Sequence, residues 1–223
     1  MAVHAGPDIV TDGLILHLDA ANARSYSGSG TTWTDLSDRG NNLTTSNSPP
    51  FSTSNGGYFG FNGSSQSASR AGTLSGMNYN NFSVVVGFRS TTRKQYMALV
   101  GDDVHSAGYA GYTTELSDGS PLMWSNNNTL GTTEKYDDGR WHIAAFTMRT
   151  GSNNCTIFVD GVSRITGTLP TPNTINTSFM VATWGVSGYN YAGDIAFTKI
   201  YNRTLESAEV VNIYNALRGR FGL

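Results

Sequence analysis

Charged residues and cysteine are both scarce in this sequence, and their scarcity excludes two classes of protein. Only 13% of the 223 residues are charged, the net charge is −2, and the basic residues are scattered rather than clustered. Such a chain has no electrostatic attraction for a phosphate backbone, so we expect no nucleic acid partner. The one cysteine, Cys155, cannot form an intramolecular disulfide, and its apolar neighbours predict a buried thiol that fills space.

Long apolar runs are also missing. No stretch of about 18 apolar residues occurs in the sequence, so we expect no membrane-spanning helix and no membrane partner. Residues 1–12 lack the apolar run and basic flank of a signal peptide. A chain that starts at Met1 without such a signal fits a protein made and kept in a cytoplasm, or one released by lysis after assembly there.

The residues that usually carry catalysis do not cluster. The glutamates and histidines of the chain are Glu115, Glu134, Glu206 and Glu209, and His4, His17, His105 and His142. Glycosidases hold two carboxylates close together, but no glutamate here belongs to a strand of alternating acidic residues. The histidines form no pair at metal-ligand spacing, and no serine lies in a nucleophile-elbow motif. We therefore expect that the protein is not an enzyme.

Short apolar segments with a period of two dominate the sequence. Leu14, Leu16 and Leu18 share one face of the first such segment. Further segments of this kind span residues 57–61, 82–88, 96–101, 108–116, 122–124, 141–149, 156–159, 162–168, 179–183 and 192–201. Turn signals such as Asp118-Gly119 and Asp160-Gly161 separate nearly all of them. Many short strands with little helix predict an all-β fold of two antiparallel sheets.

One domain with a short arm accounts for the rest of the chain. Residues 1–12 show weak periodicity and predict an N-terminal arm, and residues 13–223 form the domain. Residues 20–57 are rich in Asn, Ser, Gly and Thr and predict a long excursion held by Trp33 and Leu36. Near the C-terminus, apolar residues at helical spacing predict one short helix at about 205–217: Val210, Ile213, Tyr214 and Leu217.

Three segments together carry a family pattern. The opening runs from Gly13 to Ser37, the central segment joins Trp141-His142 to the Val-Asp-Gly turn at 159–161, and the closing segment runs from Gly193 to Leu205. They resemble the laminin-G-like domain of the concanavalin A-like lectin/glucanase superfamily, of the type found in phage structural proteins. The resemblance covers residues 12–217 and implies a jelly-roll sandwich, but it does not by itself imply a ligand.

Two positions depart from this family. Members often carry serine where Glu206 stands, which implies that the usual cap of the terminal helix is replaced. Members also often carry an acidic residue where Phe197 stands. That departure predicts a local apolar surface at Phe197 that marks a subunit contact.

Aromatic residues in Gly-, Ser- and Asn-rich segments are the candidates for ligand contact. Stacking platforms beside hydrogen-bonding side chains suit a carbohydrate, but the same rings also suit a subunit interface or packing. The tentative ligand-binding residues are Tyr109, Tyr112, Trp124, Trp184, Tyr189 and Tyr191. Trp33 and Trp141 occupy positions that the family uses for packing, and we expect them in the core.

Calcium is the one cofactor that the resemblance implies. Laminin-G-like domains often bind this ion at the sandwich rim through aspartate and carbonyl oxygens. The tentative calcium ligands are Asp102 and Asp103, which end a predicted strand. Asp118 and the Asp137-Asp138 pair are weaker candidates because Asp-Gly sequences also simply form turns.

Two functions from different classes remain open on the sequence. The first is a structural protein of a tailed-phage virion, a capsid-decorating or fibre-type module docked by its arm and partnered by other virion proteins and by copies of itself. The second is a free-standing carbohydrate-binding module that recognises a cell-surface glycan. The two are compatible, since a virion lectin would adsorb to its host.

Overall fold

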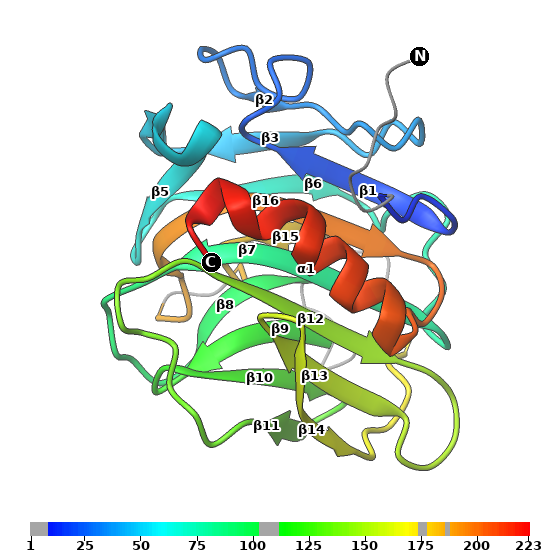
Figure 1. The fold of residues 1–223 in the computed structure, drawn as a ribbon. Coiled ribbons are helices and arrows are strands. Elements are labelled where there is room, and N and C mark those ends of the chain that lie inside the picture. Colours follow the sequence, from blue (N-terminus) through cyan, green and yellow to red (C-terminus); the bar gives the residue numbers. More distant parts are fainter. Residues whose placement is uncertain (1–8, 103–111, 174–177, 186–187) are drawn as a thin grey trace, which may run out of the picture.

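The computed structural model describes residues 9–102, 112–173, 178–185 and 188–223, and it folds them into two β-sheets packed face to face (Figure 1). Sheet A contains, in spatial order, β14 (Val162–Gly167), β13 (Cys155–Val159), β12 (His142–Met148), β7 (Phe82–Arg89), β16 (Ala192–Tyr201), β5 (Tyr58–Asn62) and β4 (Phe51–Ser52), with β1 (Leu14–Asp19) also paired to β16. Sheet B contains β11 (Asn128–Gly131), β10 (Ser120–Ser125), β9 (Tyr112–Ser117), β8 (Met97–Asp102), β15 (Ser178–Val181), β6 (Ser67–Ala71), β3 (Leu43–Ser46) and β2 (Thr32–Trp33).

All pairs within the two sheets are antiparallel, which confirms the predicted all-β sandwich. The turn signals also act as expected. Asp160 and Gly161 both have positive φ, 53° and 76°, and they close the hairpin between β13 and β14. Asp118 and Gly119 do the same between β9 and β10, with φ of 50° and 84°. Positive φ at both central residues gives the turn a twist that matches the strands it joins.

The space between the sheets holds the main hydrophobic core. Phe59 of β5 lies at its aromatic end, where Tyr26 and Trp33 approach it with ring centroids at 4.6 and 4.8 Å. Trp33 is fully buried, as predicted, and it brings part of the 20–57 excursion onto the core. Cys155 is a buried free thiol, and burial raises its pKa to about 12, so it acts as an apolar filler.

The 20–57 excursion contains elements that its composition did not predict. It supplies β2, β3, β4 and the short 3-10 helix η1 (Ser54–Gly56). The Asp35 carboxylate organises the turn after β2 by accepting hydrogen bonds from the backbone N–H groups of His17, Ser37 and Asn41, each at 2.9 Å. Three backbone N–H groups that would otherwise lack partners are thereby satisfied, so the carboxylate holds this turn together.

The terminal helix α1 (Ser207–Phe221) covers the outer face of sheet A and closes a second core there (Figure 1). Val210 and Ile213 point into this core, which agrees with the predicted helix periodicity. Phe197 corrects an expectation: its side chain has no exposed surface and its ring lies 6.1 Å from that of Phe221. The apolar residue at this position therefore serves helix packing, and it presents no surface to a subunit.

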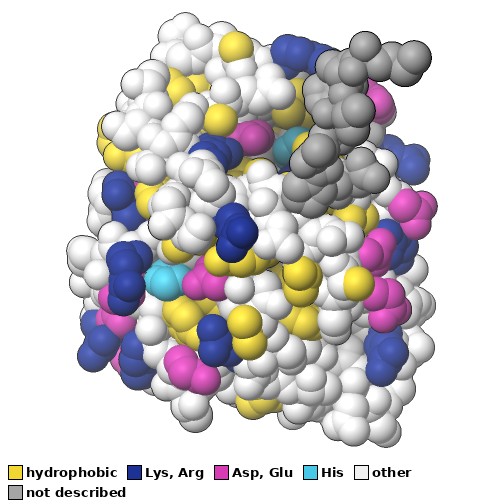
Figure 2. Space-filling model, in the orientation of Figure 1, with side chains coloured by type: hydrophobic (Ala, Val, Ile, Leu, Met, Phe, Trp, Pro, Cys, Tyr) yellow, Lys and Arg dark blue, Asp and Glu magenta, His cyan; other side chains and the backbone are white. Residues whose placement is uncertain are grey.

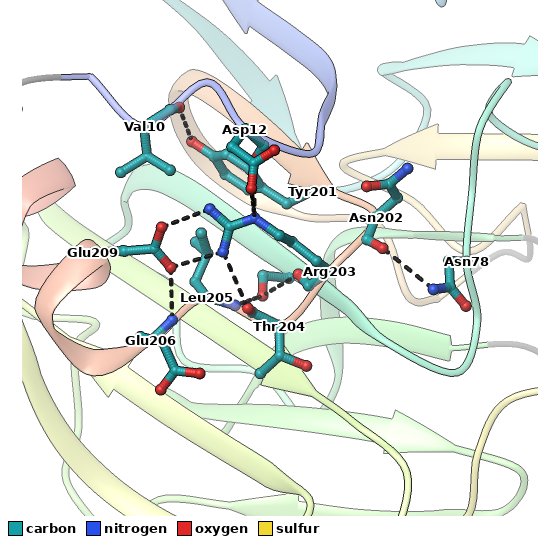
Figure 3. A network of polar contacts seen from close by, with 11 residues as sticks. Val10, Asp12, Asn78, Tyr201, Asn202, Arg203, Thr204, Leu205, Glu206 and Glu209 are labelled. Atoms are coloured by element: carbon teal, nitrogen blue, oxygen red, sulfur yellow. Dashed lines mark hydrogen bonds and ion pairs between the residues drawn. The ribbon is translucent and has the colours of Figure 1, made fainter.

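Arg203 fastens both the helix and the arm to the sandwich (Figure 3). Its guanidinium donates two hydrogen bonds to Glu209, at 2.7 and 2.5 Å, and forms an ion pair with Asp12 at 2.8 Å. Glu209 also accepts the backbone N–H of Glu206 at 2.9 Å, so a capping box forms with glutamate in place of the usual serine. The Val10 carbonyl accepts a hydrogen bond from the Tyr201 hydroxyl at 3.0 Å, so the described end of the predicted arm is tied to the domain.

The surface on the α1 side carries scattered charges among neutral polar atoms (Figure 2). Ile9 and Val211 are the largest exceptions described near this helix, with 56% and 37% of their surface exposed. Among the described residues, no helix is both long and apolar enough to cross a membrane.

Candidate functional site

An aromatic cluster lies on the outer face of sheet B, on the side of the sandwich away from α1. Alternation along β10 directs Met123 into the main core and places Leu122 and Trp124 on the outer face. Ala98 of β8 lies on the same face. Trp184, which follows β15, packs onto these residues and completes the cluster's buried part.

The rings are stacked rather than randomly packed. Trp184 and Tyr189 lie nearly parallel, with centroids 4.5 Å apart and an interplanar angle of 13°. Tyr96 stacks on Trp184 at 6.5 Å, and Trp124 lies 6.2 Å from Trp184. Trp124 and Trp184 are each 6% exposed, whereas Tyr96 and Tyr189 are partly exposed and form the outer rim. We call these four residues the aromatic cluster.

Backbone hydrogen bonds hold the rim in place. The Ala98 N–H donates to the Tyr189 carbonyl at 2.9 Å, and the Tyr191 N–H donates to the Ala182 carbonyl at the same distance. The Thr183 hydroxyl donates to the Asn190 side-chain oxygen and accepts the Gly185 N–H at 3.0 Å. These hydrogen bonds therefore hold the backbone near Trp184 and Tyr189 against β8.

Two polar side chains of β9 lie on the same face, beneath the cluster. Thr113 is directly opposite Trp124, and Glu115 is directly opposite Leu122 on one side and Ala98 on the other. Both side chains have no exposed surface. Among the described residues, the Thr113 hydroxyl and both Glu115 carboxylate oxygens lack a hydrogen-bond partner. Burial raises the pKa of Glu115 well above its usual value, because desolvation penalises the charged carboxylate.

The structure divides the six predicted ligand-binding residues. It brings Trp124, Trp184 and Tyr189 together in the aromatic cluster. Tyr112 and Tyr191 need correction, because their rings lie fully buried in the main core, where they cannot contact a ligand. Tyr112 begins β9 and faces the inside of its sheet, and Tyr191 directly precedes β16 and packs into the same core. Tyr109 lies outside the described residues.

Asp102 lies at the end of β8, as expected, but its surroundings are apolar. It is 3% exposed and accepts a hydrogen bond from the Tyr79 hydroxyl at 2.7 Å. Burial raises its pKa to about 7, and the Tyr79 hydrogen bond opposes that shift. No group of three or more His, Cys, Asp or Glu side chains converges among the described residues. The other predicted calcium ligand, Asp103, falls outside them, so calcium binding stays a prediction.

The two described histidines are held by neighbours in the sandwich. His142 lies between Asp160 at 2.8 Å and Asp138 at 3.1 Å. Burial lowers the pKa of His142, but the two carboxylates outweigh burial and raise it above its ordinary value. His17 contacts Lys199 at 2.9 Å, and burial together with this lysine lowers the pKa of His17 to about 4. The ring nitrogens of these two histidines thus contact carboxylates or a lysine.

A sequence comparison identifies the family. The family model described as concanavalin A-like lectin/glucanases superfamily, of laminin G type, matches residues 62–211, which is more than half of the chain. The chain belongs to this superfamily. Within the lectin/glucanases superfamily its sandwich of two antiparallel sheets is the expected fold. No curated protein sequence matches the chain.

Solved structures agree with the superfamily fold at low sequence identity. Domain 4 of AbnA, an extracellular GH43 arabinanase from Geobacillus stearothermophilus solved with arabinotriose, is 17% identical, with a TM-score of 0.68 over 90% of this chain and 98% of that domain. Trypanosoma rangeli sialidase is 15% identical, with a TM-score of 0.70 over 95% of this chain and 34% of the sialidase. The botulinum neurotoxin serotype G binding domain is 15% identical, with a TM-score of 0.66 over 90% of this chain and 50% of that domain.

Sequence patterns missed three residues of the site: Tyr96, Thr113 and Glu115. Tyr96 stands at the start of a predicted strand, where nothing distinguishes a rim residue from a packing residue. Glu115 did carry a signal, because a lone glutamate in a strand of apolar and threonine residues faces away from the core. Such a position usually faces solvent, and only the packing of Trp124 and its neighbours shows that this one is buried.

Proposed function

We propose that this domain is a carbohydrate-binding module, that it is not an enzyme, and that the aromatic cluster is its binding site. The observation that carries the proposal is the stacked pair of Trp184 and Tyr189, set beside Tyr96 and above polar side chains of β9. Flat apolar rings pack against the C–H faces of sugars, and neighbouring polar groups bind their hydroxyls. The carbohydrate-bound arabinanase domain of the same fold supports the proposal by analogy.

Tyr189→Ala is expected to weaken glycan binding at least about tenfold, because it removes the partly exposed ring of the stacked pair. The measurement is a glycan array followed by calorimetric titration with the best glycan. Tyr214→Ala is the matched control, since Tyr214 is a partly exposed tyrosine on α1, beyond the other sheet. Equal loss in both variants, or an unchanged affinity in Tyr189→Ala with its fold intact by circular dichroism, would remove the cluster from the binding site.

We also propose a setting for this module: the virion of a tailed phage, where it serves as a capsid-decorating or fibre-type protein. The opening strand β1 and its flanking residues resemble phage structural proteins, and Ile9 of the predicted docking arm has 56% of its surface exposed. Mass spectrometry of purified phage particles from the source is expected to find peptides of this chain. Their absence from particles that contain the other structural proteins would refute the virion setting. The proposal of a carbohydrate-binding module would remain.

A further inference from the structure

Glu115 is a buried acid that has neither a hydrogen-bond partner nor an ion-pair partner among the described residues. Its side chain has no exposed surface, both carboxylate oxygens lack hydrogen-bond partners, and none of the ion pairs among the described residues includes it. Buried carboxyl groups are rarely left in this state, because the desolvation is not offset by any contact. Such an orphaned group therefore needs an explanation from function rather than from stability.

The position of Glu115 supplies that explanation. The cross-strand pairs put it directly opposite Leu122 and Ala98, and Trp124 lies one pleat further along β10 on the same face. The Thr113 hydroxyl, also without a partner, lies opposite Trp124. The outer face of β9 thus offers three unused oxygen atoms beneath a cluster of four rings.

Aromatic rings next to a carboxyl group favour a cationic ligand. The faces of Trp and Tyr rings attract cations, and this attraction grows when water is excluded. A carboxylate without a partner attracts the same cations and gains an ion pair with hydrogen bonds when one arrives. A neutral sugar would gain from the rings but would leave the buried carboxyl with little more than a hydroxyl contact.

We propose that the aromatic cluster and Glu115 together bind a protonated amine, so that the ligand is an amino sugar whose amino group is free rather than acetylated. This inference rests on the proposed carbohydrate site and names its ligand class. The ammonium group lies among the rings and donates to the Glu115 carboxylate, while the Thr113 hydroxyl accepts a further hydrogen bond. Because Trp124 and Trp184 are only 6% exposed, the ligand enters when the rim residues Tyr96 and Tyr189 move aside. Burial favours the protonated form of the Glu115 carboxyl, so its proton passes to solvent as the carboxylate forms against the bound ammonium.

The test compares two oligosaccharides of equal length by calorimetric titration, a glucosamine tetramer and its N-acetylated counterpart. The wild-type protein is expected to bind the glucosamine tetramer about tenfold more tightly. Glu115→Gln is nearly isosteric with the neutral carboxyl and is expected to abolish this preference. Glu134→Gln is the control, because Glu134 is an exposed glutamate in a different segment, and it should keep the preference. Titrations in buffers of different ionisation enthalpy should show proton release in the wild type and none in Glu115→Gln.

Three results would overturn the inference: equal affinity of the wild type for both tetramers, a preference that survives in Glu115→Gln, or binding of neither tetramer. The proposed function fails separately. If neutral glycans bind in a manner that Tyr189→Ala removes, the carbohydrate site stands and only the amine is refuted. If no glycan of any class binds, both proposals fall.

Discussion

Replacing Glu115 with leucine is expected to raise the free energy of unfolding by about 1–3 kcal/mol at neutral pH, which is the usual cost of an unsatisfied buried polar group. Leucine has a similar volume and suits the apolar neighbours Leu122, Ala98 and Trp124. Stability increases because the variant lacks a carboxyl group that folding desolvates without forming a hydrogen bond in exchange. The measurement is urea unfolding followed by tryptophan fluorescence.

The pH dependence of this effect has a definite sign. Burial raises the pKa of Glu115 in the folded state above the ordinary value of 4.5 that it has when unfolded. The native state therefore keeps its full stability below about pH 4.5 and loses the Glu115 contribution as the pH rises toward the folded-state pKa. The stability difference between Glu115→Gln and the wild type should accordingly be small at about pH 4.5 and grow as the pH rises above it. A difference that stays constant with pH would mean that the carboxyl is not buried in solution.

If both sets of results are obtained, Glu115 is an example of a group that lowers stability and serves binding. Functional sites often retain residues that a purely structural optimum would replace. The amine titrations and the unfolding curves address different properties of the same side chain. If Glu115 both lacks a partner in the fold and binds the ligand, its replacement raises the free energy of unfolding and weakens amine binding in the same variant.

Phe59→Ala is expected to lower the free energy of unfolding by about 3–5 kcal/mol, the usual cost of deleting a buried aromatic ring. Phe59 has 1% of its surface exposed, and rings of the 20–57 excursion meet it from several directions: Tyr26, Trp33 and Phe51. Its loss removes the surface onto which that excursion packs. The measurement is again urea unfolding, with proteolysis to detect local opening of residues 20–57.

Two variants control the Phe59 result. Phe59→Leu keeps most of the apolar volume and should cost about 1 kcal/mol. Val162→Ala removes an apolar side chain that is 51% exposed on the edge strand β14 and should change the stability by less than about 0.5 kcal/mol. A Phe59→Ala loss no larger than that of Val162→Ala would show that the excursion does not depend on this aromatic core.

The terminal helix shows what a local sequence pattern can and cannot predict. The spacing of Val210, Ile213 and Leu217 predicted the helix within a few residues, because one apolar face in a period of 3.6 has few other solutions. The same pattern did not show that Phe197 lies beneath this helix. That contact joins residues far apart in sequence, so a substitution that resembled an exposed apolar surface turned out to be a packing residue.

The sequence by itself determined the fold class, the terminal helix, the Asp-Gly hairpins and the buried state of Trp33 and Cys155. These features follow from local rules, the periods of two and 3.6 and the positive φ that a tight hairpin needs. The tertiary structure alone decided which aromatic residues share a site, placing Trp124, Trp184 and Tyr189 together and Tyr112 and Tyr191 in the core. It alone showed that Glu115 is buried without a partner, because burial on the outer face of a sheet depends on what packs over it. Alternation along a strand determines on which face of the sheet a side chain lies, whereas only tertiary packing determines which residues cover that face.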